Sequence, residues 1–169
     1  MIHLFLLKHV RSLLHCESRS KRSSSVCSGM TSSTRWSAPI TDYHYPLPRI
    51  EDLFAALGGG EQYTKLDLSN AFQQCLLHKD SQAMTAITTH VGTFVYKRVP
   101  FGIKCIPENF QKIMEETLSG LSSTAVFADD ICVTGRDKKT HLANLRAVLQ
   151  RLSENGLRIN FSKCKFFSR

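Results

Sequence analysis

The sequence predicts an α+β domain, in which helices pack on one face of a mainly antiparallel sheet. Three segments carry apolar residues at helical spacing, and the segments between them are rich in β-branched and aromatic residues. Four of these extended segments are predicted to pair as two hairpins, which join antiparallel strands. Helices that alternate with such hairpins are typical of α+β domains.

The first predicted elements are a short helix and a strand. Residues 63–69 are a strand candidate, and residues 75–78 are expected to continue in an extended course. Before them, three glycines at 58–60 end a helix. Its apolar side chains recur at helical spacing, namely Ile50, Leu53, Phe54 and Leu57.

A hairpin and a second helix follow. Residues 85–89 and 93–99 are rich in β-branched and aromatic side chains and are only three residues apart, which predicts a hairpin. Pro107 opens a helix that ends before Gly120. The side chains of this helix form one stripe, consisting of Phe110, Ile113, Met114, Thr117 and Leu118.

The last predicted elements are a hairpin, the longest helix and a strand. Residues 126–128 and 131–133 are short apolar strands around a tight turn, and residues 157–161 form the final strand. Residues 138–155 form the helix, which Gly156 ends. Its inward face is expected to consist of Leu142, Leu145, Val148, Leu149 and Leu152.

Positive charge is concentrated at the N-terminus. The formal net charge is +8, and residues 1–36 carry six Lys or Arg against one acid, whereas the remainder carries sixteen against thirteen. This balance is compatible with a polyanionic partner. We expect residues 1–36 to be an irregular or disordered extension, or alternatively an organelle-targeting segment, and residues 37–169 to be the folded domain.

The six cysteines form no C-x-x-C pair and do not lie at zinc-like spacing with the histidines. Free thiols favour a reducing intracellular compartment, cytoplasm or nucleus. No run approaches the ~18 apolar residues of a membrane span, so no membrane partner is expected. Four histidines are interpreted as surface or turn residues: His44, His78, His90 and His141.

Two adjacent acids, Asp129 and Asp130, stand between the apolar segments of the last hairpin. The simplest geometry is a tight turn with both acids at its tip. An exposed turn whose carboxylates bond nearby backbone amides is the plain alternative. Asp67 adds a third acid, on a strand that is apolar on either side at Leu66 and Leu68.

A cluster of these three acids would need cations. Each pair of like charges ~4 Å apart costs about 4 kcal/mol at an effective dielectric of 20. Carboxylates combined with substrate phosphates suit Mg²⁺, and two such ions can clamp the attacking and leaving oxygens of a phosphoryl transfer. Sequence spacing alone does not establish that Asp67 reaches Asp129.

Five blocks of sequence occur in an order that carries a family resemblance. They are YPLPRIEDLFAALGGG (45–60), YTKLDLSNAFQQ (63–74), FVYKRVPFGIKCIPENFQ (94–111), FADDICVTG (127–135) and HLANLRAVLQRLSENGLRINFSKCKF (141–166). Together they resemble the reverse transcriptases of gypsy-like long-terminal-repeat retrotransposons. The resemblance implies a polymerase palm with part of the fingers.

The resemblance also implies a catalytic site. Asp67 and Asp129 match the metal ligands of the family, and Asp130 matches a second, less direct aspartate that is also essential. Leu68 would offer its backbone carbonyl to a metal. The implied cofactor is a pair of Mg²⁺ ions, with Mn²⁺ as a substitute, and the implied partners are deoxynucleoside triphosphates and a primed RNA or DNA template.

Further residues match substrate contacts of the family. Phe72 matches the steric gate that excludes a ribose 2′-hydroxyl, with a core aromatic as the alternative. The other residues of the triphosphate site would be Ser69, Asn70 and Ala71. Template and primer contacts would come from Pro100, Phe101, Gly102, Gln111 and Phe127. An exposed helix residue is the alternative for Gln111.

The chain departs from the family pattern at both ends. By the resemblance, we expect the fingers strands that precede the Y-P-L-P segment to have no clear counterpart in this sequence, and the primer-grip strands, thumb and ribonuclease H regions to lie outside it. Affinity for a nucleic-acid duplex is therefore expected to be low and sensitive to salt. Two functions remain open: an RNA-directed DNA polymerase that extends a primer 3′-hydroxyl, or an inactive retroelement remnant that binds nucleic acid weakly.

Overall fold

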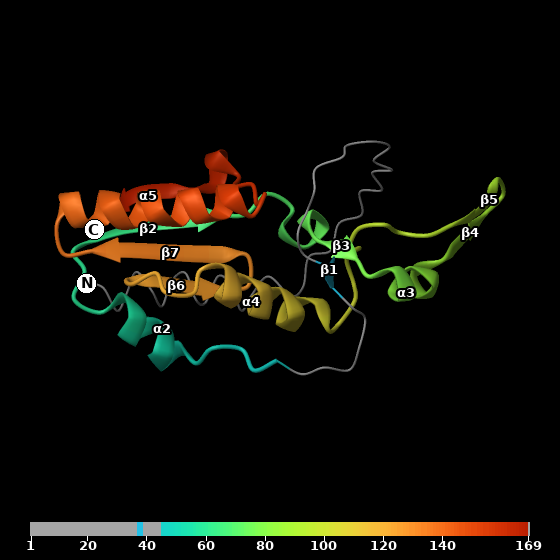
Figure 1. Cartoon of the computed structure of the whole chain (residues 1–169), viewed down its shortest axis with the longest axis horizontal. Coiled ribbons are helices and arrows are strands. Elements are labelled where there is room, and N and C mark those ends of the chain that lie inside the picture. Colours follow the sequence, from blue (N-terminus) through green and yellow to red (C-terminus); the bar gives the residue numbers. More distant parts are fainter. Residues whose placement is uncertain (1–36, 39–44, 169) are drawn as a thin grey trace. The chain divides into compact units, whose positions relative to one another are not determined.

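The computed structural model describes residues 37–38 and 45–168, which belong to one compact unit. The expectations for residues 1–36 and for His44 lie outside the described residues. Within the described part, helices and antiparallel strands combine as expected for an α+β domain (Figure 1). None of the helices in this part is both long and apolar enough to cross a bilayer.

The central feature is a four-stranded sheet with the order β6-β7-β2-β8, in which every neighbouring pair is antiparallel. In chain order, its strands are β2 (Gln62–Asp67), β6 (Thr124–Phe127), β7 (Asp130–Gly135) and β8 (Lys165–Ser168). Strands distant in sequence thus lie side by side, with β2 between β7 and β8.

The two faces of this sheet differ in chemistry because side chains alternate along a strand. Leu66 of β2 and Ile131 of β7 are opposite each other and fully buried. The neighbouring positions Lys65, Asp67 and Asp130 point to the other face. One face therefore builds the core, and the other presents charged groups.

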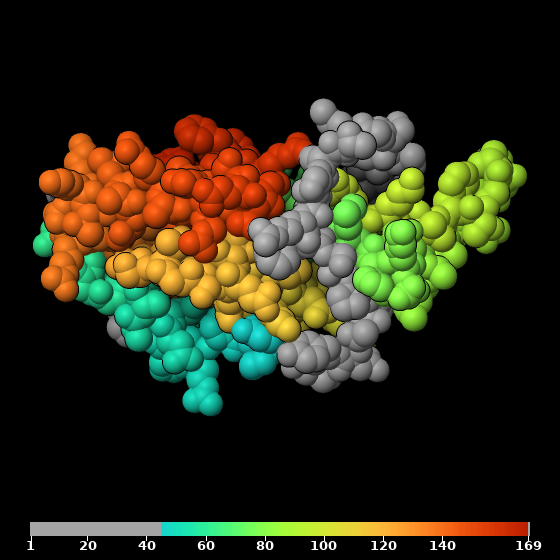
Figure 2. All heavy atoms as spheres, viewed as in Figure 1, coloured from blue at the N-terminus to red at the C-terminus, as the bar shows by residue number. Residues whose placement is uncertain are grey.

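Helices α4 (Ile106–Thr117) and α5 (Lys138–Glu154) cover the apolar face, and Figure 2 shows their atoms next to each other, in gold and orange. Helix α2 (Ile50–Leu57) contacts β6 and β7 but buries only Leu57. The core side chains from the two covering helices are Phe110, Ile113, Met114, Leu145, Val148 and Leu152. Helices thus cover one face of the sheet, as predicted.

Two shorter pairings lie outside the main sheet. Strand β1 (Ser37–Ala38) runs parallel to β3 (Leu76–Leu77), and β4 (Ile87–Thr89) forms a hairpin with β5 (Gly92–Phe94). The predicted strand over 93–99 is wrong beyond Phe94.

The remainder of that predicted strand, residues 95–99, runs beside β3 instead and forms hydrogen bonds with it. The amide of Leu77 donates to the carbonyl of Lys97 at 2.9 Å, and the amide of Val99 donates to the carbonyl of Cys75 at 3.2 Å. Short helical turns fill the connections, consisting of η2 (Ala71–Gln74), α3 (Lys79–Gln82), η3 (Ala83–Thr85) and η4 (Phe161–Lys163).

The inward face of α5 differs from the prediction by one position. Leu142 is 45% exposed, whereas His141 is fully buried. The ring nitrogen Nε2 of His141 lies 2.7 Å from the hydroxyl of Thr64, and its ring packs edge-on against Phe167. Because Thr64 of β2 offers a polar partner, His141 takes the buried position that was predicted for Leu142. The interpretation of His141 as a surface residue is therefore wrong.

The predicted strand over 157–161 is also wrong. Ile159 forms only an isolated bridge with Leu68, and η4 follows. The strand lies later, as β8, where Lys165 is opposite Lys65 of β2. The segment still runs along β2, since the amide of Asn160 donates to the carbonyl of Asp67 at 2.8 Å.

Candidate active site

The turn between β6 and β7 holds only one of the two adjacent acids. Phe127 is opposite Asp130 in the ladder, so Ala128 and Asp129 form the two-residue turn. Asp130 is the first residue of β7, which corrects the prediction that both acids lie at the tip. The register places Ile131 on the apolar face, and a slip by one residue would turn it away from the core.

Ala128 adopts a left-handed backbone with φ of +52°, and Asp129 does not. A positive φ at the first central residue alone is the pattern of a type II′ turn, where glycine is preferred. A left-handed L-residue costs about 1–2 kcal/mol, so neighbouring contacts must hold this turn in place.

Asp67 lies next to the acid turn, as the family resemblance implies. Asp67 of β2 is directly opposite Asp130 of β7, and such residues share one face of a sheet with Cβ atoms about 4.5–5.5 Å apart. The amide of Leu68 donates to the carbonyl of Asp129 at 3.2 Å, which joins the turn to the end of β2. The prediction that Asp67 reaches the acid turn is confirmed.

The electrostatics of the acids reflect their proximity. Burial is the largest cause that raises the pKa of Asp67 and of Asp130 above the ordinary value. The charge of Asp129 raises both pKa values further, whereas nearby lysines lower them. Addition of a cation to this cluster would therefore stabilise the ionised carboxylates.

Two lysines lie beside the acids. The Nζ atom of Lys65 is 2.7 Å from Oδ2 of Asp130, and the Nζ atom of Lys163 is 3.9 Å from Oδ1 of Asp67. Sequence reasoning singled out neither residue. For Lys65 a signal existed, because residues two apart on a strand share a face, so Lys65 accompanies Asp67.

The oxygen donors fit a hard divalent cation. Within residues 37–38 and 45–168, no three His, Cys, Asp or Glu side chains form one metal-binding group. Mg²⁺, however, is usually held by one or two carboxylates together with waters and substrate phosphates. Asp67 and Asp129 can supply the two carboxylates. The role of the Leu68 carbonyl as a metal ligand stays a prediction.

The segment after Asp67 carries the residues predicted to bind the triphosphate, and this role stays a prediction. Asn70 has a φ of +48°, a conformation that asparagine tolerates better than most residues, and it precedes η2. Ala71 is buried, and Ser69 is partly buried.

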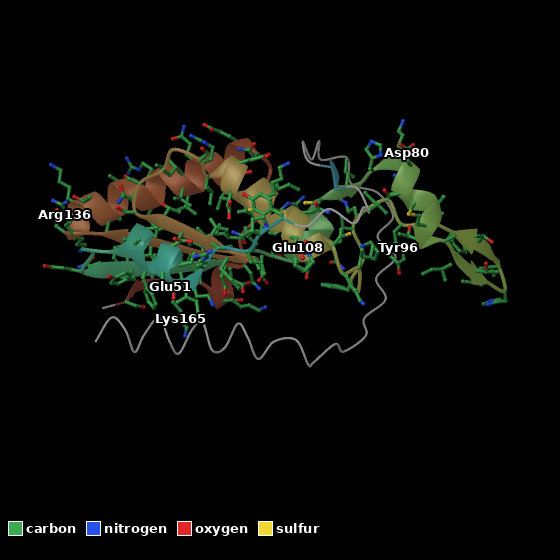
Figure 3. All side chains as sticks on the ribbon, turned by 90° about the horizontal axis from the view of Figure 1, so that it is seen from below. Glu51, Asp80, Tyr96, Glu108, Arg136 and Lys165 are labelled. Carbon is green, nitrogen blue, oxygen red and sulfur yellow. The ribbon has the colours of Figure 1, made fainter. Side chains whose placement is uncertain are left out.

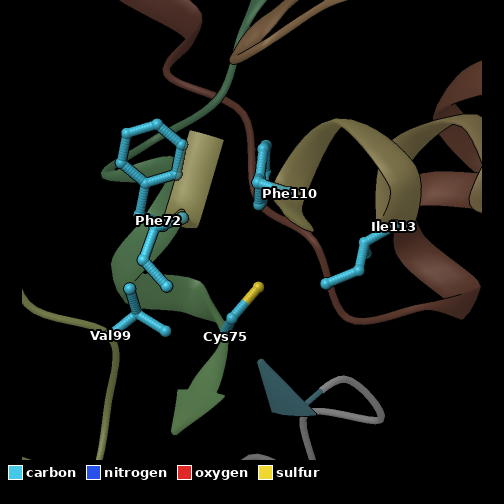
Figure 4. A pocket seen from close by; sticks show the side chains of 6 residues that line it. Phe72, Cys75, Val99, Phe110 and Ile113 are labelled. Atoms are coloured by element: carbon cyan, nitrogen blue, oxygen red, sulfur yellow. The ribbon is translucent and has the colours of Figure 1, made fainter. Parts of the chain in front are cut away.

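Phe72 is partly buried, and its ring packs edge-on against Phe110 with centroids 5.3 Å apart. Figure 4 shows both rings at a small apolar pocket that is also lined by Cys75, Val99, Ile106 and Ile113. The alternative of a core aromatic thus holds in part, and the steric-gate role stays a prediction.

Gln74 connects this segment to the C-terminal part of the chain, a role that no sequence pattern indicates. Its Nε2 group donates to the carbonyls of Ser69 at 2.7 Å and Arg158 at 2.9 Å. Its Oε1 atom accepts from the amide of Arg158 at 2.7 Å. A single side chain therefore ties Ser69, the first residue of the predicted triphosphate segment, to Arg158 in the connection that follows α5.

Gln111 is not an exposed helix residue, because its side chain is fully buried in α4. Its Oε1 atom accepts from the amide of Ala128 at 2.7 Å, and its Nε2 group donates to the carbonyl of Val126 at 3.0 Å. A buried amide that is occupied in this way has no surface left for a template. Gln111 instead supports the acid turn.

A chain of hydrogen bonds extends from this support to the Y-P-L-P segment. The Nε2 group of Gln111 also donates to Oε1 of Glu115 at 2.7 Å, and the hydroxyl of Tyr45 donates to the same carboxylate. The backbone amide of Tyr45 donates to Glu108 at 3.2 Å. Helix α4 thus connects residue 45 with the turn at Ala128.

The other predicted template residues lie at varied depths. Phe101 is 65% exposed, and Gly102 is exposed with a φ of +91°. Pro100 and Phe127 are partly buried. Figure 3 labels Tyr96, which lies on the segment between β5 and Pro100. The template roles of these four residues stay predictions.

Comparison with known proteins decides the family. The model of the family described as reverse transcriptase (RNA-dependent DNA polymerase) matches residues 10–169. The chain belongs to the reverse transcriptase family. The match begins within the range that was set apart as an extension.

Curated relatives of this chain are much longer proteins. The Caenorhabditis elegans protein K02A2.6 is 39% identical over 83% of the chain, and the Pol polyprotein of the Drosophila melanogaster transposon 412 is 36% identical over 73%. The chain spans 10% of the length of each. The expected retrotransposon origin is confirmed by such polyproteins.

Solved reverse transcriptases share the fold. The foamy viral protease-reverse transcriptase in complex with an RNA/DNA hybrid is 26% identical, with a TM-score of 0.64 over 76% of this chain and 17% of that one. A second foamy viral structure, bound to double-stranded DNA, has a TM-score of 0.65 over 73% of this chain and 23% of that one. The expected polymerase fold is thereby confirmed.

Proposed function

We propose that this chain is the catalytic palm of an RNA-directed DNA polymerase, which transfers deoxynucleotides to a primer 3′-hydroxyl on an RNA or DNA template. The observation that carries the proposal is the position of Asp67 opposite Asp130, with Asp129 in the adjoining turn. Family membership supports the same reaction, and the nucleic acids bound by the foamy viral relatives support the same partners.

In this proposal the acids hold the divalent ions. Asp67 and Asp129 would be the principal ligands, and Asp130 would support them from the first position of β7. Two bound ions would neutralise charge on the attacking and leaving oxygens. The chain itself positions the acids, because two strands fix Asp67 and Asp130 and the amide contacts of Gln111 fix the turn.

The segment from Ser69 to Phe72 would bind the nucleotide. The backbone amides of Ser69, Asn70 and Ala71 would approach the phosphates, because backbone N–H groups can surround an anion. The ring of Phe72, held from behind by Phe110, would lie against the sugar and exclude a 2′-hydroxyl. Replacement of Phe72 by valine should therefore raise the incorporation of ribonucleotides relative to deoxynucleotides.

Primer extension on poly(rA)-oligo(dT) with Mg²⁺ or Mn²⁺ tests the proposal. The wild-type chain is expected to incorporate dTTP above background, whereas Asp129→Asn should reduce incorporation to background. Asp52→Asn provides a matched control, because Asp52 is an exposed acid in the first turn of α2. This variant should retain wild-type incorporation.

The same assay separates the polymerase from an inactive remnant. Equal, background-level incorporation by the wild type and Asp129→Asn would refute polymerase activity of this chain. Duplex binding measured against salt then tests the remnant as a weak binder, because phosphate contacts weaken steeply as salt rises. Undetectable binding even at low salt would exclude that role as well.

A further inference from the structure

Of the two lysines that pair with the acidic cluster in the described part of the chain, Lys65 makes the shorter contact. Its Nζ atom lies 2.7 Å from Oδ2 of Asp130, and the two side chains are only 21% and 11% exposed. The alternation of β2 places Lys65 on the same face as Asp67, two positions along the strand. One ammonium group therefore stands within the part of the sheet that carries the proposed metal ligands.

The surroundings of Lys65 concentrate its influence on the acids. Its partner on the neighbouring strand β7 is Cys132, which lies two residues after Asp130 and on the same face of the sheet. The positive charge of Lys65 lowers the pKa of Asp67, of Asp130 and of Cys132. A partly buried ion pair is screened less by salt than an exposed one, so this influence persists at physiological ionic strength.

Lys163 is less well placed for the same task. Its Nζ atom is 3.9 Å from Asp67, and its side chain is 67% exposed. Exposed pairs with long contacts contribute little, because solvent screens them and the side chain is free to move. Of these two lysines, Lys65 is therefore the internal one.

We propose that Lys65 is a positioning residue that binds Asp130 as an internal counter-cation, leaves Asp67 and Asp129 as the metal ligands, and weakens the binding of divalent cations by the cluster. The proposal rests on the proposed function, because it assumes that these acids bind metal. An ammonium group has three donors and no acceptor, so it cannot join the coordination shell. It repels the incoming ion and competes with it for Asp130.

Titration of the full chain with Mn²⁺, followed by the electron paramagnetic resonance signal of the free ion, tests this role without any need for catalysis. Lys65→Gln removes the charge and keeps a hydrogen-bond donor for Asp130. It should bind Mn²⁺ more tightly than the wild type by about tenfold, the order expected for one partly screened charge. Lys65→Arg, which keeps the charge, should bind as weakly as the wild type.

Two controls locate the effect. Asp129→Asn should weaken Mn²⁺ binding in both the wild-type and the Lys65→Gln background, because the acid turn supplies a ligand. Lys139→Met removes an exposed charge near the opposite end of β7 and should leave the affinity unchanged. Equal affinities of the wild type and Lys65→Gln, or equal gains for Lys65→Gln and Lys65→Arg, would overturn the proposal.

Melting temperatures separate binding from folding. Addition of Mn²⁺ should raise the melting temperature of Lys65→Gln and Lys65→Met more than that of the wild type, because binding to the folded state stabilises it. An equal or smaller rise in both variants would overturn the proposal. Failure of primer extension together with tighter Mn²⁺ binding by Lys65→Gln would reject the polymerase function and leave the role of Lys65 intact.

Discussion

Asp67 and Asp130 occupy directly opposite positions on neighbouring strands, although the two residues are far apart in the sequence. Their carboxylates therefore share the charged face of the sheet, beside the turn that holds Asp129. The geometry depends on a few contacts of the turn, the sheet and helix α5, and four substitutions or conditions test them.

Gln111→Ala should destabilise the chain, because it leaves the amide of Ala128 and the carbonyl of Val126 without their partner. Each unsatisfied buried group costs about 1–3 kcal/mol, so we expect a loss of roughly 2–4 kcal/mol in urea unfolding. Gln150→Ala is the matched control, since that side chain contacts Glu154 on the exposed surface of α5. A similar small effect of both substitutions would contradict the supporting role of Gln111.

Ala128→Gly should stabilise the acid turn. Glycine adopts a φ of +52° without the cost of a side chain, which is about 1–2 kcal/mol, and its greater freedom in the unfolded state offsets part of the gain. The net gain in the free energy of unfolding is expected to be below about 1 kcal/mol. Ala128→Val should show the opposite sign, and a stabilising valine would be incompatible with this backbone conformation.

Gly135→Ala should destabilise the end of β7. A Cβ atom at this position would lie 2.4 Å from the amide nitrogen and 2.5 Å from the Cα atom of His141, which are backbone atoms that a rotamer change cannot move. We expect a loss of about 2–3 kcal/mol or more in thermal or urea unfolding. Gly58→Ala should be tolerated, because the same atom there meets its neighbours at 3.4 and 3.5 Å.

Stability should fall between pH 7.5 and pH 5 because of His141. Burial lowers its pKa in the folded state, whereas the unfolded histidine titrates near about 6.5. As the pH falls through that value, the unfolded state binds more protons, which costs the folded state up to about 1.4 kcal/mol per pH unit. Urea unfolding across this range should show a weaker dependence for His141→Gln and the wild-type dependence for the exposed His90→Gln.

The helices could be predicted where one local pattern was sufficient. The bounds of α2 and α4 follow from apolar spacing, glycine and proline, which act within a few residues. Helix α5 was located equally well, but its buried face was not. The choice between His141 and Leu142 depends on Thr64, a partner on another strand that no local pattern reveals.

The position of Asp67 beside the acid turn was predictable, whereas the residues that contact the acids were not. The resemblance named Asp67, Asp129 and Asp130 but was silent on Lys65 and Gln74. It also assigned Gln111 to the template, whereas the buried amide supports the turn. The roles of these residues depend on which strand or helix packs against them, and only the tertiary structure shows that.

The sequence by itself determined the family, the order of the elements and the identity of the three acids, because motifs and periodicity are properties of neighbouring residues. The tertiary structure decided the register of β2 against β7, and with it the separation of Asp129 in the turn from Asp130 in the strand. That register is selected by burial of Leu66 and Ile131 against the helices, since a shift of one residue would expose them.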